Sequence, residues 1–405
     1  MSIQYIVLGA GRQGTASAYD LAKFGGADRV TMADVDRFVA QAAADRVNQL
    51  IGRSIADAIA LDVKDDQAVR QAIKGYNVVL SAVPYFFNLN LTKIAIECGV
   101  SFCDLGGNTE IVRQQHGLDA EAKRAGVTVV PDCGMGPGMG NTLAVYAMEL
   151  LDKTDHIYLF DGGLPIEPQA PWNYVESFSL EGLTNEYHDG MMVLRNSELT
   201  TIPPFSEMEI VNIPPLGKME AFIVAGGVST TPWTFQGKLK TLQLKVLRYP
   251  GTFAQLKAYS DLGLYDFKPI KVDGVDVIPR RVFHTLYGPH VHADVVKDIC
   301  IVRAHAIGRK NGQRAEALID LVDRYDPHTG FSSMERTTGW HLSIMAAMIA
   351  HKQIAAGAVP LELAVPGHAF VAEAKIRGFK IKTKVTTAKA KAIAKSRTKS
   401  KLRKN

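Results

Sequence analysis

The sequence IQYIVLGAGRQG, residues 3–14, decides the fold of this chain. Its apolar first half predicts a buried strand, and the residues after Gly14 predict a helix that continues to residue 23. In this strand–turn–helix context GxGxxG is a dinucleotide-binding turn. The first glycine permits the tight turn, the second lets backbone approach a pyrophosphate, and the third lets helix and strand pack closely. We therefore predict cofactor contacts from Gly9, Gly11, Arg12, Gln13 and Gly14.

The next expected strand, residues 29–33, runs into Asp34, which lies 20 residues after Gly14. A carboxylate at this place can bind both ribose hydroxyls of a dinucleotide and repels a 2′-phosphate, which favours NAD over NADP. Arg37 nearby weakens that preference. The alternative role for Asp34 is that of a helix-capping side chain.

Strand-like and helical patterns keep alternating up to residue 130. We expect strands at residues 55–61, 77–83, 100–104 and 127–130, and helices at 66–74, 90–98 and 109–124. This alternation predicts an α/β fold with a doubly wound, Rossmann-type parallel sheet, whose ligands lie beyond the carboxyl ends of the strands. Further cofactor contacts are therefore predicted from Asp62, Ser81, Ala82, Val83, Pro84, Leu105 and Gly106.

A second glycine-rich loop, PDCGMGPGMGN at residues 131–141, follows the last of these strands. Four glycines and two prolines in eleven residues exclude a strand or helix, so we expect a tight loop before a helix at residues 142–151. Asn141 is suited to cap that helix, whose unpaired N–H groups would attract a carboxylate or phosphate. The alternative is a glycine-rich connection with no ligand.

From residue 152 the pattern changes to short β-rich runs, at residues 157–160, 175–178, 221–224 and 239–247. Connectors rich in proline and glycine separate these runs, without a regular helix between strands. This pattern predicts an α+β domain built on a mixed or antiparallel sheet.

Three stretches resemble the saccharopine dehydrogenase family, especially its lysine 6-dehydrogenase branch. They are SAVPYFFNLNL at residues 81–91, CDLGGNTEIV at 103–112 and the loop at 131–141, and the resemblance runs through most of residues 1–378. Saccharopine reductases typically carry an Asp in a GLDPG loop, a residue implicated in their chemistry. Aligning the PG pair places Gly136 there, which argues against saccharopine and towards the lysine dehydrogenase branch.

The resemblance also implies a domain plan. We expect an NAD-binding Rossmann domain at residues 1–150 and an α+β domain at 151–330 that covers the nicotinamide crevice and makes subunit contacts. A helical segment at 331–374, which contains the family-like MERTTG at 334–339, would return to the cofactor domain. The implied assembly is a homo-oligomer, a dimer or higher.

The expected reaction is NAD-dependent oxidation of the ε-amine of L-lysine, giving a semialdehyde that cyclises to piperideine-6-carboxylate. An ammonium with a pKa of about 10.4 must lose a proton before its carbon gives up hydride. The candidate bases are Asp104, Asp132, Glu186 and Tyr187, and no spacing decides among them.

The amino-acid substrate is expected to contact Gly107, Asn108, Gly138, Asn141 and Arg248. Arg248 lies in LRYPG, which resembles a family motif, and can form a bidentate pair with a carboxylate. The alternative is an ion pair within the α+β domain. The alternative reaction is reductive condensation of the saccharopine or carboxynorspermidine type.

The net charge of +5 conceals an acidic body and a basic tail. Residues 375–405 contain 13 Lys or Arg and no Asp or Glu, so the rest of the chain has 33 basic and 41 acidic residues, a balance of −8. We expect this tail to be disordered, and either to bind nucleic acid or another polyanion or to act as a solubilising extension. A cofactor-binding regulator with a nucleic-acid-binding tail is therefore a function of a different class.

Cellular location and metal content are predicted from absences in the sequence. No export signal or membrane-length apolar run is visible, and the four cysteines lack metal-binding spacing, so we expect a cytoplasmic protein with reduced thiols. His290 and His292 alternate in a β-like run, with His284 and His305 further away, but this set lacks convincing metal ligands. No metal is expected.

Overall fold

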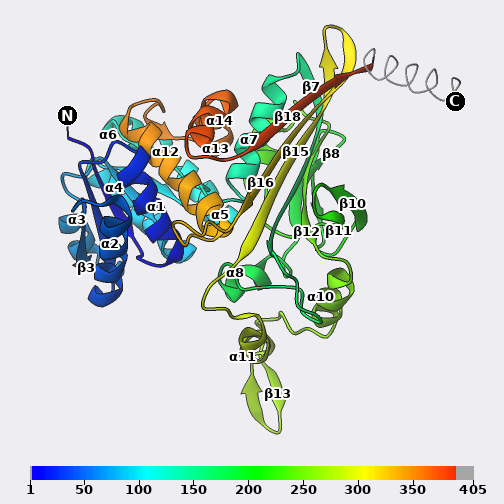
Figure 1. Cartoon of the computed structure of the whole chain (residues 1–405), viewed down its shortest axis with the longest axis horizontal. Coiled ribbons are helices and arrows are strands. Elements are labelled where there is room, and N and C mark those ends of the chain that lie inside the picture. The colour runs from blue at the N-terminus through cyan, green and yellow to red at the C-terminus, as the bar shows by residue number, and fades with distance from the viewer. Residues whose placement is uncertain (1, 389–405) are drawn as a thin grey trace, which may run out of the picture.

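A seven-stranded parallel sheet forms one layer of the computed structural model, which describes residues 2–388 (Figure 1). Its strands are β1 (Gln4–Leu8), β2 (Arg29–Asp34), β3 (Ala56–Ala60), β4 (Val78–Ser81), β5 (Ser101–Asp104), β6 (Thr128–Val130) and β17 (Gly357–Ala358). The order β17-β6-β5-β4-β1-β2-β3 places a crossover between β1 and β4, so their carboxyl ends diverge into a crevice.

Helices cover both faces of this sheet. They are α1 (Arg12–Phe24), α2 (Arg37–Ile51), α3 (Asp66–Ala72), η1 (Tyr85–Phe87), α4 (Asn88–Glu97), α5 (Thr109–His116), α6 (Asp119–Ala125) and α7 (Met139–Glu149). Alternate residues of β1 enter two different cores, because successive side chains of a strand point to opposite faces. Tyr5 and Val7 pack with α1 and α2, whereas Ile6 and Leu8 pack with α3 and α4.

The second layer is a nine-stranded mixed sheet. Its strands are β7 (Lys153–Pro165), β8 (Met191–Arg195), β9 (Glu198–Ile202), β10 (Glu209–Ile213), β11 (Gly217–Phe222), β12 (Thr241–Arg248), β15 (Asp298–Lys310), β16 (Gln313–Arg324) and β18 (Ile381–Thr387). Strands β7 and β12 pair in parallel, and β15 runs antiparallel to β7 along 12 paired residues. The predicted fold class, a Rossmann-type sheet plus an α+β domain, is confirmed.

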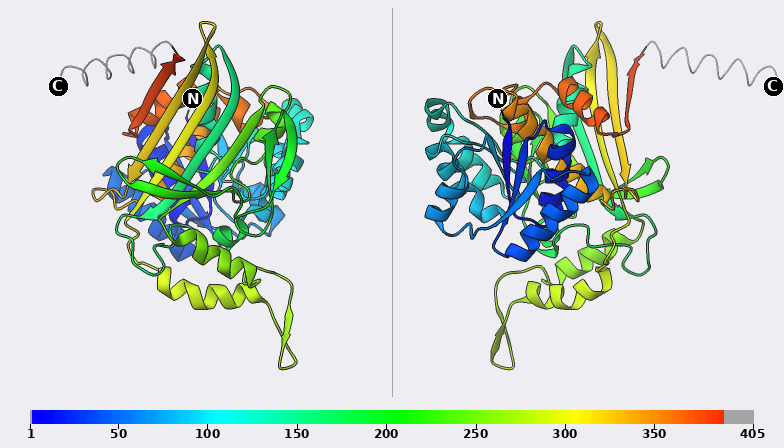
Figure 2. Two further views of the ribbon diagram at one scale, coloured as in Figure 1. Left: turned by 90° about the vertical axis from the view of Figure 1, so that its right-hand side faces the viewer. Right: turned by 60° about the vertical axis from the view of Figure 1, so that its left-hand side comes forward.

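Helix α7 joins the two layers. It follows the parallel sheet directly, and its Leu143 shares one core with Leu159 of β7 and Val302 of β15. Figure 2 shows the long strands of the second sheet standing beside the Rossmann layer, with α10 (Thr252–Asp261), the hairpin of β13 (Ile270–Val272) and β14 (Val275–Val277), and α11 (Pro279–Val291) below. The second domain also contains the short helices α8 (Leu180–Asn185) and α9 (Thr231–Phe235).

After β16 the chain returns to the first layer. The returning elements are η2 (Glu335–Gly339), α12 (Trp340–Ala350), α13 (Leu361–Ala364) and α14 (Gly367–Ile376). Helix α12 packs on α1, and β17 adds a strand beside β6. Beyond α14, Arg377 forms an ion pair with Asp20 of α1 (Nε–Oδ2, 2.8 Å), and both side chains are fully buried. The C-terminal segment is therefore fastened to the helix that begins at the GxGxxG turn.

Several local predictions are wrong. The single helix expected at residues 109–124 is two helices, because the chain leaves helical geometry at Gly117 and Leu118. Residues 175–178 form no strand. His290 lies in α11 and His292 caps its end, so they do not alternate on a strand. Helix α7 begins at Met139 and not at residue 142, with Gly138 as its N-cap; Asn141 does cap the helix, but from inside its first turn, where its side chain accepts from Gly138 N.

The expectation of a disordered tail from residue 375 is also wrong for its first part. Strand β18 pairs with β16, with Ile381 opposite Leu321 and Val385 opposite Ala317. Lysines alternate with these residues, so a period-two pattern was hidden in a lysine-rich composition. The remainder of the basic tail, and with it the predicted polyanion contact, lies outside the described residues.

Within residues 2–388, no helix combines the length and apolar character needed to cross a membrane. The same residues contain no cluster of three or more His, Cys, Asp or Glu side chains placed to hold a metal ion. All four cysteines are free.

Candidate functional site

Two glycines of the first turn, Gly9 and Gly14, are sterically required by the fold, whereas Gly11 is not. Gly9 has a φ of +94°, and a Cβ there would lie 2.7 Å from the carbonyl oxygen of Ala82. A Cβ at Gly14 would overlap the carbonyl oxygen of Gly9. Gly11, with an ordinary φ of −72°, has no atom within 4 Å of the same position. The space above Gly11 is thus open, as close approach of a phosphate to the backbone requires.

Asp34 is held at this turn by backbone. Its Oδ2 accepts a hydrogen bond from Ala10 N (2.9 Å) and its Oδ1 accepts one from Asp36 N (3.1 Å). A carboxylate offers about four acceptor sites, so capacity remains for ribose hydroxyls. Val35 and Phe38 beside it are 71% and 84% exposed and offer an apolar surface for a base. This part of the crevice fits a dinucleotide.

The remaining residues that were predicted to contact the cofactor lie along the same edge of the sheet, but they differ in burial and in the contacts that they make. Ser81 is fully buried and donates to Asn88 Oδ1 (2.7 Å). Ala82 and Val83 pack against Gly9. The other predicted contacts follow the ends of neighbouring strands: Asp62 after β3, Pro84 after β4, and Leu105 and Gly106 after β5.

Two residues of the turn connect to the rest of the molecule. Arg12 Nη1 donates to the carbonyl oxygen of Glu176 in the second domain (3.1 Å). Gln13 Oε1 is buried and has no hydrogen-bond partner among residues 2–388, as expected of a group that awaits a ligand.

The second glycine-rich loop closes on itself and rests on β7. Gly134 and Gly138 form a bridge, and a Cβ on Gly136 would overlap Oδ2 of Asp161. Asn141 fixes the loop, because its Oδ1 accepts from Gly138 N (3.2 Å) and its Nδ2 donates to Val228 O (3.1 Å). The amide of Asn141 is thus engaged within the protein.

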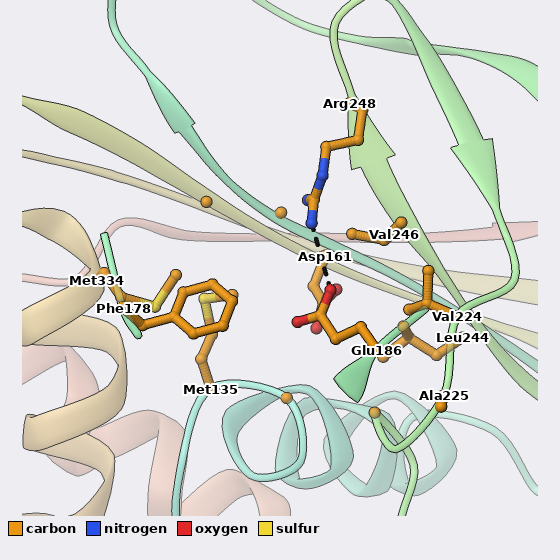
Figure 3. A pocket seen from close by; sticks show the side chains of 14 residues that line it. Met135, Asp161, Phe178, Glu186, Val224, Ala225, Leu244, Val246, Arg248 and Met334 are labelled. Atoms are coloured by element: carbon orange, nitrogen blue, oxygen red, sulfur yellow. Dashed lines mark hydrogen bonds and ion pairs between the residues drawn. The ribbon is translucent and has the colours of Figure 1, made fainter. Parts of the chain in front are cut away.

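A cavity opens between this loop and the second sheet (Figure 3). Its polar side chains are Asp161, Glu186 and Arg248, and Glu186 Oε2 lies 3.3 Å from Arg248 Nη2. The remaining lining residues are Met135, Gly136, Gly162, Gly163, Phe178, Val224, Ala225, Gly227, Leu244, Val246 and Met334. One cation and two acids therefore face a mainly apolar wall.

Arg248 is held in place by several acceptors. Its Nη1 donates to Leu247 O (3.1 Å), and its Nη2 donates to the hydroxyl of Tyr187 (3.0 Å) as well as to Glu186. Burial raises the pKa of Tyr187 to about 12, so its hydroxyl stays protonated. Within the described chain Arg248 Nε is buried without an acceptor. The alternative of an internal ion pair is therefore observed, and one donor remains for a substrate carboxylate.

The pKa values of Asp161 and Glu186 are each raised to about 7, chiefly because burial removes water from both carboxylates. The charge of Glu186 raises the pKa of Asp161 further, and the guanidinium of Arg248 lowers both. Two neighbouring acids that titrate near neutral pH in a cleft can exchange protons with a ligand.

Two of the predicted bases, Asp104 at the end of β5 and Asp132 in the loop itself, do not line the cavity. Asp104 is fully buried and accepts from Gly106 N and Gln115 Nε2, both at 2.7 Å, and burial raises its pKa to about 6. Burial raises the pKa of Asp132 well above its ordinary value, and its Oδ1 packs where a Cβ of Gly106 would lie. Both acids follow strand ends as predicted, and the Asp132 backbone N–H donates to Asp104 Oδ1 (3.4 Å), but neither carboxylate lines the cavity.

The expected substrate contacts after β5 serve the local backbone. Gly107 packs against the ring of Tyr85, and Asn108 Oδ1 caps α5 by accepting from Ile111 N (3.1 Å). Asp161 is the cavity residue that sequence reasoning missed. Its signal was an acid that interrupts the apolar run IYLF and precedes two glycines.

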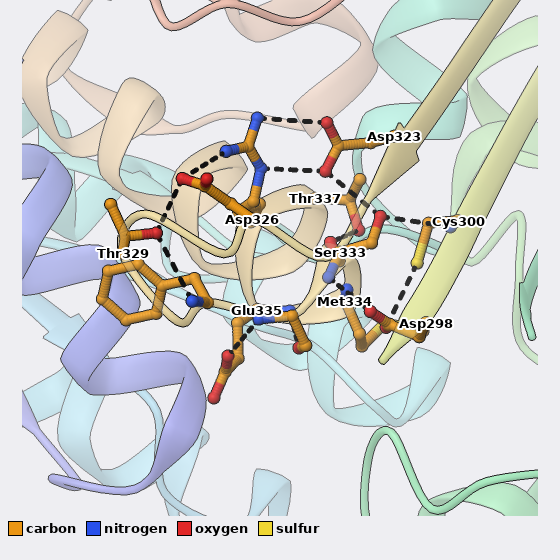
Figure 4. Close-up of polar contacts among 12 residues, drawn as sticks. Asp298, Cys300, Asp323, Asp326, Thr329, Ser333, Met334, Glu335 and Thr337 are labelled. Carbon is orange, nitrogen blue, oxygen red and sulfur yellow. Dashed lines mark hydrogen bonds and ion pairs between the residues drawn. The ribbon is translucent and has the colours of Figure 1, made fainter. Parts of the chain in front are cut away.

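The cavity wall is tied to both layers by residues 332–339 (Figure 4). Asp298 on β15 accepts from Ser333 N (2.5 Å) and Met334 N (2.9 Å), and Arg336 pairs with Asp323 (Nε–Oδ2, 2.9 Å). From the same segment Ser17 of α1 donates to Gly339 O (2.8 Å). The Met334 side chain is thus fixed between the cofactor turn and the second sheet.

Two protein-family models match the chain. The saccharopine dehydrogenase NADP binding domain matches residues 5–130, and the saccharopine dehydrogenase C-terminal domain matches residues 134–373. Among curated proteins, the saccharopine dehydrogenase (NADP(+), L-glutamate-forming) of Saccharomyces cerevisiae is 29% identical over 216 residues, which cover 51% of this chain and 48% of that protein. The protein of the same name from Schizosaccharomyces pombe is 25% identical over 52% of this chain and 48% of its own length. The chain thus spans about half the length of the curated relatives it matches.

Two solved structures share the fold. Apo saccharopine dehydrogenase (L-Glu forming) from Saccharomyces cerevisiae superposes with a TM-score of 0.76 at 19% identity, covering 95% of this chain and 100% of that one. Homospermidine synthase from Legionella pneumophila in complex with NAD superposes with a TM-score of 0.62 at 14% identity, covering 95% of this chain and 92% of that one.

Proposed function

The chain belongs to the saccharopine dehydrogenase family, and on that premise we propose that it is a pyridine-nucleotide-dependent oxidoreductase that oxidises the carbon of a primary amine. The proposed substrate is the ε-amine of L-lysine and the proposed cofactor is NAD. The expected product is the semialdehyde, which cyclises with its own α-amine to piperideine-6-carboxylate.

The observation that carries this proposal is the charge of the cavity. Its described lining contains two acids, Asp161 and Glu186, and one cation, Arg248, which is already paired with Glu186. An alkylammonium suits such a site, because the acids neutralise its charge and the apolar wall contacts its methylenes. A substrate with several carboxylates would need more cations than this lining offers.

The proposed preference for NAD depends on Asp34. Two backbone N–H groups hold its carboxylate beside the turn, where it accepts hydrogen bonds from ribose hydroxyls and repels a 2′-phosphate. The curated relatives are named for NADP, so cofactor choice is a point on which we expect this chain to differ from them.

In the proposed reaction, R–CH₂–NH₃⁺ first loses a proton to an acid of the cavity. The bound nicotinamide supplies the hydride acceptor, and the substrate becomes R–CH=NH₂⁺. Water adds to that carbon and ammonium leaves, giving R–CHO, so one proton is released overall. Met135, Phe178 and Met334 exclude bulk water from the reacting carbon, which strengthens the electrostatic interactions of the site.

The test is incubation of the purified protein with NAD or NADP and single amino acids, followed by nicotinamide absorbance. We expect lysine-dependent reduction of NAD without a second carbonyl compound. Turnover that requires an added 2-oxo acid or aldehyde would refute the lysine reading and favour reductive condensation of the saccharopine or carboxynorspermidine type. The names of the relatives make that reaction the second candidate.

We also propose that the chain works as a homo-oligomer, with subunit contacts made by the second domain. Light scattering of the purified full chain measures this directly. A monomer at all accessible concentrations would contradict it.

A further inference from the structure

We propose that Asp161 is the catalytic residue that takes the proton from the substrate amine, and that Glu186, which is paired with Arg248, is the counterion of the resulting iminium. This inference rests on the proposed function, because it assumes an amine substrate. It replaces the four bases predicted from the sequence with a residue of β7.

The position of Asp161 supports this role. It lies on β7 and lines the cavity (Figure 3), and Gly136 of the loop that follows β6 packs against its carboxylate. Its residue is only 7% exposed, and no described residue donates a hydrogen bond to its carboxylate. A buried carboxylate without a donor is costly to keep, so its presence in a cavity indicates a ligand that supplies the donor.

The glycine opposite Asp161 has a matching explanation. A Cβ at position 136 would overlap Asp161 Oδ2, so every other residue at this position would cover or displace the carboxylate. Gly136 therefore lets the loop pack directly against β7 without displacing the Asp161 carboxylate from the cavity.

Glu186 is less suited to accept the proton. Arg248 Nη2 lies 3.3 Å from its Oε2, and a paired guanidinium favours the charged form of a carboxylate. An ionised Glu186 beside the substrate nitrogen favours the cationic iminium that forms when hydride leaves.

The other candidates do not line the cavity. Both oxygens of Asp104 accept hydrogen bonds, from Gly106 N and Gln115 Nε2. Asp132 Oδ1 is buried without a partner among the described residues, but it packs against Gly106 and not against the cavity. The hydroxyl of Tyr187 accepts from Arg248 and belongs to the support of that guanidinium.

The proton balance of the cycle is complete. Asp161 COO⁻ takes one proton from R–CH₂–NH₃⁺, and the free amine loses hydride to the nicotinamide to give R–CH=NH₂⁺. One water adds its oxygen to the carbon, and its two protons leave with the nitrogen as NH₄⁺. Asp161 then releases its proton to solvent, which restores the base.

The experiment compares Asp161→Asn with the wild-type enzyme across pH, on whichever amine of a panel the wild type oxidises. We expect kcat to fall by about 10²–10⁴-fold, the range for loss of a general base. The acidic limb of the wild-type kcat/KM profile should disappear, while NADH binding followed by fluorescence stays unchanged. Asp155→Asn is the matched control, since it makes the same substitution on the same strand at an ion pair with Lys240.

A second variant covers the case in which Asp161→Asn folds poorly. Gly136→Ala keeps the acid but places a methyl group on its Oδ2, so it should also lose rate. Glu186→Gln should raise the KM for the amine and keep the acidic limb.

Each remaining outcome decides the matter. The inference is overturned if kcat of Asp161→Asn stays within about threefold of the wild-type value, or if this variant keeps the acidic limb of the kcat/KM profile. It is also overturned if Glu186→Gln is the variant that loses the acidic limb. A wild-type enzyme that oxidises no amine overturns the proposed function and this inference together. A wild type that oxidises only a secondary amine overturns the lysine proposal alone.

Discussion

Replacing Asp161 by asparagine should stabilise the protein at alkaline pH, because the wild-type carboxylate must ionise in a buried site. Folding raises the pKa of this side chain from 3.8 to about 7, mainly by desolvation. In the unfolded chain the group is ionised above about pH 4, whereas the folded protein holds its proton up to about pH 7. The contribution to stability is therefore greatest below pH 4 and is lost as pH rises to about 7.

The magnitude follows from about 1.36 kcal/mol per pKa unit. A shift of about three units costs the wild type about 2 kcal/mol near pH 5.5 and about 4 kcal/mol near pH 8, relative to a side chain that does not titrate. Asparagine is close in shape and carries no charge. We expect Asp161→Asn to exceed the wild type in stability, and the excess to grow by about 2 kcal/mol between these two pH values.

Thermal unfolding of both proteins at the two pH values measures this growth. Asp155→Asn provides the control, because it makes the same substitution on the same strand at a carboxylate that is paired with lysines. An Asp161→Asn protein that is less stable than wild type near pH 8, or whose excess is equal at both pH values, refutes the reasoning. The result does not depend on knowing the substrate.

Three further predictions concern the cofactor domain. Arg377→Met should lower stability by about 3–5 kcal/mol in chemical denaturation, because it leaves Asp20 buried and unpaired. Asp34→Ala should weaken NAD binding in fluorescence titration by roughly ten- to a hundredfold, because it removes charged hydrogen bonds worth about 1.5–3 kcal/mol. The same variant should also reduce the ratio of the affinity for NAD to the affinity for NADP. Gly11→Ala should keep the wild-type melting temperature and lose NAD affinity, whereas Gly14→Ala should melt lower because its Cβ overlaps backbone.

The parts of the fold that follow from local periodicity were predictable. Apolar runs separated by helical patterns gave the parallel sheet from β1 to β6 and the position of its ligand edge. Strand β17 was not predictable, because Gly357 and Ala358 form two residues of strand only where the chain returns to β6. Strand β18 was missed because its high lysine content was taken to indicate disorder, although Ile381, Thr383 and Val385 alternate with lysines at a period of two and pair with β16.

In the candidate site, too, one part could be predicted from the sequence and another could not. The GxGxxG turn and Asp34 lie within one βαβ unit, so sequence spacing alone places them together. The cavity instead joins Asp161, Glu186 and Arg248 from segments that are far apart in sequence. Their meeting depends on the pairing of β7 with β12 and on how the loop after β6 lies over β7, and no local pattern encodes either.

The glycine at position 136 and the acid at position 161 are structurally linked. A family loop with Asp before the PG pair carries its carboxylate on the first domain, and here the loop carries a glycine at that place while the neighbouring strand supplies the acid. A Cβ at 136 would overlap Asp161 Oδ2 as that side chain now lies, so an acid at 136 would displace the Asp161 carboxylate and bring two like charges close together. The absence of a loop acid therefore does not argue against proton transfer at this crevice. Under our proposal Asp161 of β7 supplies the carboxylate from the second domain, so the packing of the two layers sets its position relative to the substrate.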